Sequence, residues 1–258
     1  MNVDALFSVQ GRVALVTGGS SGIGRHIATG YAAAGAKVYI CARTETKVMA
    51  AAQAINEATG GTCIGLTADL STLGGIDALV AQMAARENAL HMLVNNAGTM
   101  ADAPIDDYGE DDWDQVIDLN LKAPFFILQK FLPLLRAGGT AERPASLINI
   151  GSVGALKVGP KENYAYQASK SAIHWMAKGL AKRLGRDNIT ANVIAPGFFE
   201  SEMTVIASDE MRKMVEAMVP RGRVGTPEDL AGAAIYLASR AGAYVTGSVI
   251  PVEGGLSI

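Results

Sequence analysis

The residues Arg12-Val-Ala-Leu-Val-Thr17, followed by Gly18-Gly-Ser-Ser-Gly22-Ile-Gly24, decide the fold. The first six form a short apolar run rich in branched residues, which predicts a buried strand. The glycines predict a tight turn, from which a helix is expected to run to about Ala34. In such a unit the glycines let the backbone approach a pyrophosphate, and the helix N-terminus holds its charge. The spacing is Thr-Gly-x-x-x-Gly-x-Gly, so a plain strand-to-helix turn without a ligand is the alternative.

The rest of the chain repeats the alternation of strands and helices. Further strands are expected at 37–41, 62–67, 92–94, 145–150, 189–194 and 249–252. Helices are expected between them, at 44–59, 74–89, 111–135, 164–184 and 227–238. This order predicts an α/β fold: a Rossmann-like, doubly wound parallel sheet of about seven strands with helices on both faces. We expect a single domain over residues 1–258, since no linker-like break divides the chain.

The overall composition narrows the class of protein. The 258 residues are 49% hydrophobic and 18% charged, with a formal net charge of −3, which suits one large globular domain. No basic tract indicates nucleic acid or an anionic membrane surface, and no apolar run is long enough to predict a membrane span. Cys41 and Cys63 lie in apolar runs and are expected to be buried thiols, with no metal site. The N-terminus lacks a signal-peptide pattern, so a cytoplasmic location is expected.

The end of the second expected strand bears on the choice of cofactor. In dinucleotide sites an acidic residue there binds the ribose hydroxyls, whereas an arginine accommodates a 2′-phosphate. Here the strand ends in Ala42-Arg43, and Ser20 and Ser21 are available from the glycine turn. This favours NADP(H), with NAD(H) still possible. The alternative is that Arg43 is a solvated arginine at a helix start.

The candidate catalytic pair is Tyr166 and Lys170, in the stretch Tyr164-Ala-Tyr166-Gln-Ala-Ser-Lys170. Residues four apart share one face of a helix, so the phenol and the ammonium can lie close together. A nearby cation lowers the pKa of a phenol and fits it for general acid–base chemistry near neutral pH. Tyr164 lies six residues before Lys170 and is expected to point elsewhere. A Tyr-x-x-x-Lys spacing also occurs by chance, so this pair indicates catalysis only together with the sequence motifs around it.

Two further stretches carry open alternatives. Asn120 lies in an apolar helical stretch, where an asparagine is more often a structural hydrogen-bonding residue than a catalyst, and Pro124 is expected to bend the helix after it. Residues 200–225 contain four methionines, which adapt to irregular apolar surfaces. We predict that residues 198–225 form a lid and substrate wall, with ordinary helical core packing as the alternative.

Taken together, the motifs resemble those of the short-chain dehydrogenase/reductase family over essentially the whole chain. They are Thr17-Gly-Gly-Ser-Ser-Gly-Ile-Gly24, Asp69, Asn95-Asn-Ala-Gly98, Asn120, Ser152, Tyr166-x-x-x-Lys170 and Pro196-Gly197. Each is weak alone, but all of them in this order are specific. The endings Cys41-Ala-Arg43 and Ala243-Tyr-Val-Thr-Gly247, with Ile148–Val153 and Tyr164-Ala-Tyr166, are most similar to NADPH-dependent ketoacyl reductases of the rhamnolipid-pathway kind.

The resemblance implies roles for these residues. Tyr166 would protonate the substrate carbonyl, Lys170 would lower the pKa of Tyr166 and bind the nicotinamide ribose, and Ser152 would position the carbonyl. Asn120 would hold a water that links Lys170 to solvent, in place of the structural role. The cofactor would contact Gly18, Ser20, Ser21, Gly22, Ile23, Gly24, Arg43, Asp69, Leu70, Asn96, Ala97, Gly98, Tyr166, Lys170, Pro196 and Gly197. The substrate would contact Ser152, Tyr166, Phe198, Phe199 and Met203.

The resemblance also implies an assembly and shows one departure. Relatives usually form homotetramers, or homodimers, with the helix after Tyr166 buried against a partner, and Trp175 and Leu180 on that helix fit either this or core packing. Ser21 stands where many NADP-using relatives carry a basic residue. Discrimination against NADH is therefore expected to be modest.

Three functions remain in competition. The first is an NADPH-dependent reductase of a 3-oxoacyl thioester or similar apolar ketone, which Phe198 and Phe199 favour. The second is an alcohol, sugar or steroid dehydrogenase. The third is a nucleotide sensor without turnover, which the presence of Ser152, Tyr166 and Lys170 opposes.

Overall fold

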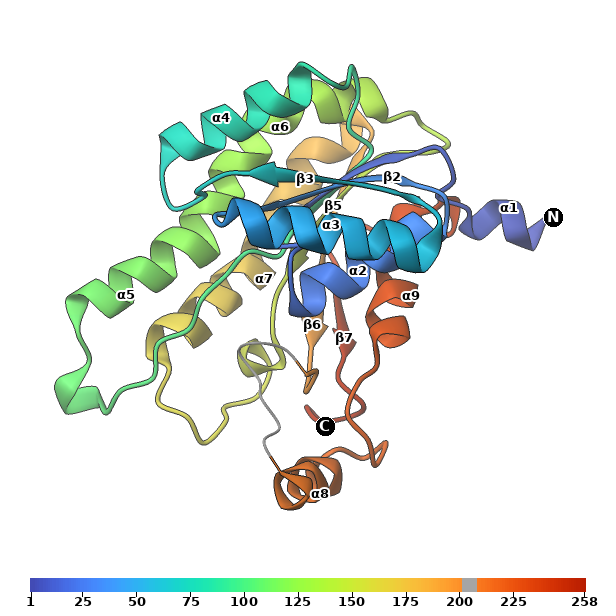
Figure 1. Ribbon diagram of the computed structural model, residues 1–258. Helices are drawn as coiled ribbons and strands as arrows, with labels where there is room; N and C mark the ends of the chain where they lie inside the picture. Colours follow the sequence, from blue (N-terminus) through green and yellow to red (C-terminus); the bar gives the residue numbers. More distant parts are fainter. Residues whose placement is uncertain (201–207) are drawn as a thin grey trace.

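The computed structural model describes residues 1–200 and 208–258, and its strands form one parallel sheet (Figure 1). The strand order is β3-β2-β1-β4-β5-β6-β7. The strands are β1 Val13–Thr17, β2 Lys37–Ala42, β3 Thr62–Thr67, β4 Met92–Asn95, β5 Ala145–Ile150, β6 Ile189–Pro196 and β7 Val249–Val252. The predicted doubly wound sheet is therefore confirmed, with strand limits within two residues of those expected.

Helices cover both faces of this sheet. They are α1 Val3–Phe7, α2 Gly22–Ala33, α3 Glu45–Thr59, α4 Leu73–Ala84, α5 Glu110–Ile117, α6 Ala123–Gly138, α7 Tyr164–Leu184, α8 Asp209–Met218 and α9 Pro227–Ala238. One apolar layer holds side chains of α2, α3 and α9, and the other holds side chains of α4, α6 and α7. Within β1, Ala14 and Val16 join the first layer and Val13 and Leu15 the second. Burial on both faces explains why the strand is a continuous apolar run rather than an alternating one.

Two helices differ from the sequence-based expectation. Helix α4 ends at Ala84, because the chain turns where the amides of Arg86 and Glu87 donate to the carbonyl of Met83. The Glu87 carboxylate then accepts a 2.6 Å hydrogen bond from Tyr39. The helix expected over 111–135 runs from α5 into α6 through a π-helical turn, Asp118–Lys122, just before Pro124. The proline is thus accommodated by one wide turn, which keeps the helical path continuous.

The Met-rich region contains helix α8, Asp209–Met218. Ser208 caps α8 by accepting from the amide of Met211. Met211, Met214 and Met218 are exposed, so ordinary core packing does not account for them. Helix α8 lies apart from the sheet (Figure 1). The lid over residues 198–225 stays a prediction, and Met203 lies outside the described residues.

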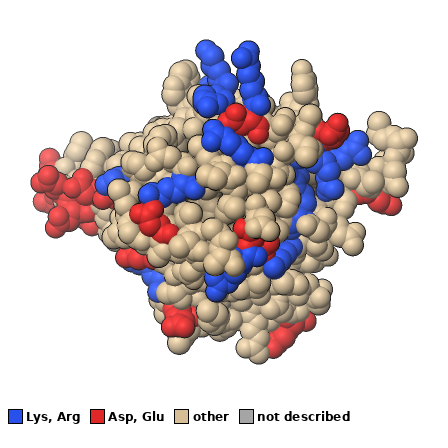
Figure 2. Space-filling view, turned by 90° about the horizontal axis from the view of Figure 1, so that it is seen from above, with Lys and Arg blue, Asp and Glu red and all other residues tan. Residues whose placement is uncertain are grey.

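The carboxyl ends of the strands meet at one edge, which positions the site. Charges on the face seen from above are mixed (Figure 2), and acidic side chains gather at the side where α5 begins with Glu110, Asp111 and Asp112.

Within the described residues, no helix has both the length and the apolar character needed to cross a membrane. No group of three or more potential metal ligands was found among these residues either.

Candidate active site

A cleft of about 300 Å³ opens at the carboxyl edge of the sheet. Most of the predicted site residues line it: Gly18, Ser20, Ser21, Gly22, Ile23, Arg43, Asp69, Leu70, Asn96, Ala97, Gly98, Ser152, Tyr166, Lys170, Pro196, Gly197 and Phe199. Gly24 and Asn120 lie behind its wall rather than on it. Phe198 lines a neighbouring hollow of about 240 Å³, which shares Phe199 with the cleft.

The glycine turn forms one end of the cleft and is tied to the end of β4. The Thr17 hydroxyl accepts from the amides of Asn96 and Ala97, at 2.9 and 3.0 Å. Gly18 has φ of +63°, and a Cβ there would lie 2.9 Å from the Cα of Ala97. A Cβ on Gly24 would lie only 2.4 Å from Asn96 Nδ2. The close approach of the two segments therefore demands glycine at both positions.

Arg43 and Asp69 stand at the same end of the cleft. Arg43 follows β2 and is exposed, and no ion pair engages it among the described residues. Asp69 accepts hydrogen bonds from the amide and the hydroxyl of Ser71, at 3.0 and 2.8 Å. These bonds, followed by the charge of Arg43, lower the pKa of Asp69. The ionised Asp69 carboxylate and the Arg43 guanidinium can thus both bind a ligand at this end of the cleft.

Ser152, Tyr166 and Lys170 form the other end. Ser152 directly follows Gly151 at the end of β5, and its hydroxyl accepts a 3.0 Å hydrogen bond from the amide of Gly154. Lys170 is buried and donates from Nζ to the carbonyl of Ile150 at 2.8 Å. Its Nζ lies 5.6 Å from the centroid of the Tyr166 ring. Tyr164 instead faces solvent and donates to Glu162 at 2.7 Å.

The pKa of Tyr166 shows that one expectation is wrong in this structure. Lys170 was expected to lower it, but burial of the phenol raises it, and only the hydrogen bond with Ser152 acts in the opposite direction. Burial also lowers the pKa of Lys170 to about 8. Desolvation disfavours the charged form of each group, and neither shift has a contribution from the charge of the other group.

Asn120 has the contacts of a structural residue. Its Oδ1 accepts from the amide of Thr99 at 2.8 Å, and its Nδ2 donates to the carbonyl of Thr99 and to the hydroxyl of Ser169. The side chain is buried in the π-helical turn. The polar atoms of the Asn120 side chain already have protein partners. If Asn120 takes part in proton transfer, the group involved would therefore be its backbone carbonyl. Pro124, four residues on, has no N–H to donate to that carbonyl.

A histidine lies beside Ser152 that no sequence signal pointed to. His174 Nε2 accepts from the Ser152 backbone amide at 3.4 Å, not from its hydroxyl. Burial and the neighbouring Lys170 lower the pKa of His174 to about 4, so the ring is neutral at pH 7. The pair therefore lacks the hydroxyl-to-imidazole bond of a hydrolase triad. Met100, Leu119 and Ser71 also line the cleft and were missed, although Met100 could have been found from its place just after Asn95-Asn-Ala-Gly98.

Comparisons with known proteins agree with this geometry. A family model described as "Enoyl-(Acyl carrier protein) reductase" matches residues 18–257. The rhamnolipids biosynthesis 3-oxoacyl-(acyl-carrier-protein) reductase of Pseudomonas aeruginosa is 45% identical over 254 residues, which are 98% of each chain. The chain belongs to the short-chain dehydrogenase/reductase family.

Solved structures of this family superpose closely on the chain. The P. aeruginosa RhlG/NADP active-site complex has a TM-score of 0.94 and 43% identity, and the match covers 100% of both chains. A putative NAD(P)-dependent gluconate 5-dehydrogenase from Beutenbergia cavernae, with bound NADP at low occupancy, has a TM-score of 0.88 and 37% identity. That match covers 97% of this chain and 98% of the other. Both neighbours share the fold of this chain, and the second is named as a putative dehydrogenase of gluconate.

The cleft of this short-chain dehydrogenase/reductase fits a nicotinamide dinucleotide. The N-terminus of α2, a helix of 12 residues, follows the glycine turn, and its partial positive charge favours a pyrophosphate. Ser21 precedes the helix, and its side chain makes no capping bond, so its hydroxyl stays available. Gly22, with φ of +50°, lines the cleft without a side chain and so allows the close backbone approach that such a ligand needs.

Proposed function

We propose that this protein catalyses the NADPH-dependent reduction of a carbonyl group, with a 3-oxoacyl thioester as the substrate class. The observation that carries the proposal is the placement of Ser152, Tyr166 and Lys170 at one end of a cleft whose other end holds the glycine turn and Arg43. The likeness to a 3-oxoacyl-(acyl-carrier-protein) reductase supports the substrate class. Phe199 and Met100 add apolar surface near the reacting end.

Tyr166 is the proton donor in this mechanism. Because burial raises the pKa of its phenol, the group keeps its proton at neutral pH and can give it to a carbonyl oxygen. The Ser152 hydroxyl lines the same cleft as the phenol and is placed to hold the same oxygen. NADPH supplies the hydride when it is bound.

Lys170 stabilises the charge that proton transfer leaves behind. Its ammonium lies over the Tyr166 ring, so it favours the phenolate formed when the proton departs. The bond from Nζ to the Ile150 carbonyl fixes this position at the end of the strand that leads to Ser152. With a pKa of about 8, Lys170 is mostly protonated at pH 7.

The residues that would hold the cofactor divide along the cleft. The turn from Gly18 to Gly22 and the start of α2 would hold the pyrophosphate, and Arg43 the 2′-phosphate. Asp69 and Leu70 would border the adenine, and Asn96 to Gly98 the ribose. Backbone groups at Pro196 and Gly197 would hold the carboxamide. Arg43 supports a preference for NADPH, with NADH accepted less well.

Substitution of Tyr166 by phenylalanine tests the mechanism. We expect Tyr166→Phe to lower kcat by at least about a hundredfold, because general acid catalysis is lost, while NADPH binding measured by fluorescence is retained. Tyr164→Phe is the matched control: it lies two residues earlier, faces solvent, and is expected to keep the native rate. A Tyr166→Phe enzyme that reduces its substrate at the native rate would show that the assigned chemistry is wrong.

A second candidate function is oxidation of a sugar-derived alcohol. The structural likeness to a putative gluconate 5-dehydrogenase favours it. The apolar Phe199 and Met100 at the reacting end favour a thioester or another apolar ketone instead.

We further propose a homotetramer, or a homodimer, in which α7 packs against a partner. Trp175 on this helix is 73% exposed, with Lys178 Nζ over its ring at 4.5 Å, so it offers a large apolar surface for contact. Leu180 is half-buried against the protein's own core and supports the assembly less. The two buried thiols, Cys41 and Cys63, fit the reducing conditions of the cytoplasm, which we propose as the location.

A further inference from the structure

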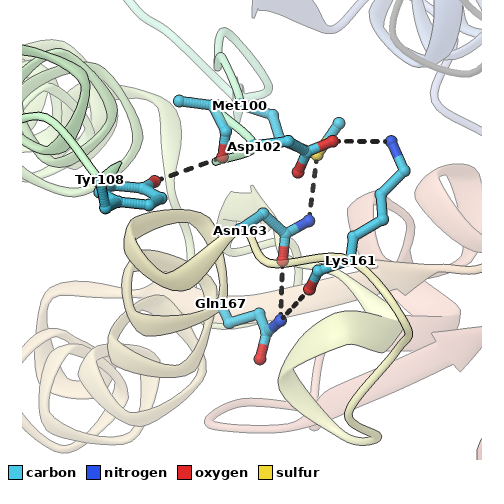
Figure 3. A network of polar contacts seen from close by, with 7 residues as sticks. Met100, Asp102, Tyr108, Lys161, Asn163 and Gln167 are labelled. Atoms are coloured by element: carbon cyan, nitrogen blue, oxygen red, sulfur yellow. Dashed lines mark hydrogen bonds and ion pairs between the residues drawn. The ribbon is translucent and has the colours of Figure 1, made fainter. Parts of the chain in front are cut away.

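Two consecutive residues after Gly98 are each held by a buried asparagine from another element. Asn120 engages both backbone groups of Thr99. Asn163, the residue that precedes α7, donates from Nδ2 to the sulfur of Met100 at 3.2 Å (Figure 3). Met100 lines the cleft, so Asn163 fixes a piece of the cleft wall. It does so from a position three residues before Tyr166.

Neighbouring bonds fix which way the Asn163 amide points. Gln167 Nε2 lies 3.3 Å from the carbonyl of Lys161, and a carbonyl can only accept. The same nitrogen therefore faces Asn163 as a donor, so the Asn163 atom 2.7 Å from it must be Oδ1 (Figure 3). This leaves Nδ2 directed at the Met100 sulfur. The order of donors and acceptors thus follows from a backbone group, not from the choice of an amide rotamer.

The contact changes the character of Met100. A methionine is ordinarily an adaptable side chain that repacks around its neighbours. Here a buried N–H would lose its partner if the sulfur moved, and an unpaired buried donor is costly. Met100 is therefore held in place, and the wall it forms is tied to the helix that carries Tyr166.

Other contacts join the same two segments but lie at the surface. Lys161 and Asp102 form an ion pair at 2.9 Å, with side chains 58% and 39% exposed. The amide of Ala103 donates to the carbonyl of Glu162 at 3.2 Å. Exposed ion pairs of this kind contribute little to the stability of the fold. The part-buried Asn163–Met100 contact is consequently the one that sets the wall.

We infer that Met100 is a specificity-determining residue and Asn163 its positioning residue. The fixed thioether forms an apolar surface at the reacting end of the cleft, against which the acyl chain of the substrate packs. This inference rests on the proposed function for the identity of the substrate, but the wall itself would act on any ketone with an apolar chain.

The test compares a long substrate with a short one. We would measure kcat/KM with NADPH for the N-acetylcysteamine thioesters of 3-oxooctanoate and acetoacetate, and for a long and a short aliphatic diketone. For Met100→Ala we expect kcat/KM for the 3-oxooctanoyl thioester to fall about tenfold, and kcat/KM for the acetoacetyl thioester to fall less than about threefold. Loss of an apolar contact of this size changes kcat/KM by such factors. Asn163→Leu should lower the ratio of kcat/KM for the long thioester to kcat/KM for the short one, but by less than Met100→Ala does. Its NADPH affinity should remain native, because Asn163 makes no capping bond that the variant would lose.

Two further variants distinguish a positioning role of Asn163 from a general loss of structure. Asp102→Asn removes the exposed ion pair and should leave the ratio unchanged. The double variant Met100→Ala/Asn163→Leu should have the ratio of Met100→Ala alone, because Asn163 acts only through Met100. An unchanged ratio in Met100→Ala would overturn the inference, as would additive losses in the double variant.

The two proposals fail in different ways. A native protein that reduces the diketones but no thioester would reject the proposed substrate class, and the diketone ratios would then decide the role of Met100. A native protein that reduces neither series would overturn both.

Discussion

At the scale of single residues, the chemistry depends on a balance between burial and charge. Tyr166 and Lys170 are both desolvated, and each is pushed toward its neutral form. A neutral phenol is the form that donates a proton, whereas a charged ammonium is the form that stabilises the product phenolate. The site therefore works in the pH range where Tyr166 is protonated and Lys170 has not yet lost its proton.

This balance predicts the pH dependence of reduction. Because burial lowers the pKa of Lys170 to about 8, the ammonium is present below that pH and is lost above it. The pKa of Tyr166 is raised, so the phenol stays protonated throughout this range. We expect kcat to be level between about pH 6 and 7 and to fall as the pH rises through about 8.

Lys170→Arg provides the control for this profile. A guanidinium stays charged at any accessible pH, so the variant should be slower but should lose the decline near pH 8. A decline with the same midpoint in Lys170→Arg would assign the titration to another group.

Sequence reasoning at this scale succeeded where spacing alone was enough. The four-residue step from Tyr166 to Lys170 put both on one helix face, and the structure places both in the cleft while Tyr164 faces solvent. The direction of the Tyr166 pKa was wrong, because it depends on burial by elements far away in sequence. The contact between His174 and the Ser152 amide was not predicted for the same reason: it depends on the packing of α7 on β6.

At the scale of elements, strands were easier to predict than helices. β5 is buried along its whole length and has the limits expected from its apolar run, and the limits of the less buried β3 and β7 were also predicted. In α8, Met211, Met214, Val215 and Met218 form an apolar stripe at helical spacing, but the three methionines face solvent, so the stripe is not packed on the core as the helical alternative expected. The π-helical turn at Asp118–Lys122 was not foreseen, since it depends on the tertiary bonds of Asn120.

The exposed face of α7 carries a prediction of its own. We expect the native protein to sediment as a tetramer or dimer and Trp175→Glu to shift it toward monomer, since a charge would be buried in the interface without a partner. Leu73→Glu, at the exposed start of α4 on a different part of the surface, should sediment as the native protein does. A native protein that sediments as a monomer, or a Trp175→Glu variant that keeps its native mass, would contradict the proposed assembly.

At the scale of the whole molecule, the fold brings distant residues to one edge. Gly18, Asn96, Ser152 and Pro196 follow or end four different strands, and parallel order places all four in the same cleft. This convergence could be predicted from the sequence, because parallel strands point their carboxyl ends the same way. The tie between Met100 and Asn163 could not, since it joins two loops whose paths no pattern specifies.

The most direct test of the account is the oxidation of NADPH and NADH by the purified protein with a panel of carbonyl compounds. The panel holds acetoacetyl and longer 3-oxoacyl thioesters, a diketone, a keto sugar acid and a ketosteroid. We predict turnover of the thioesters, with NADPH preferred by about tenfold because Arg43 can make a charge-assisted bond to the 2′-phosphate. Turnover of only the sugar acid or the steroid would contradict the proposed substrate class, and NADPH binding without any turnover would contradict the assignment of an enzyme.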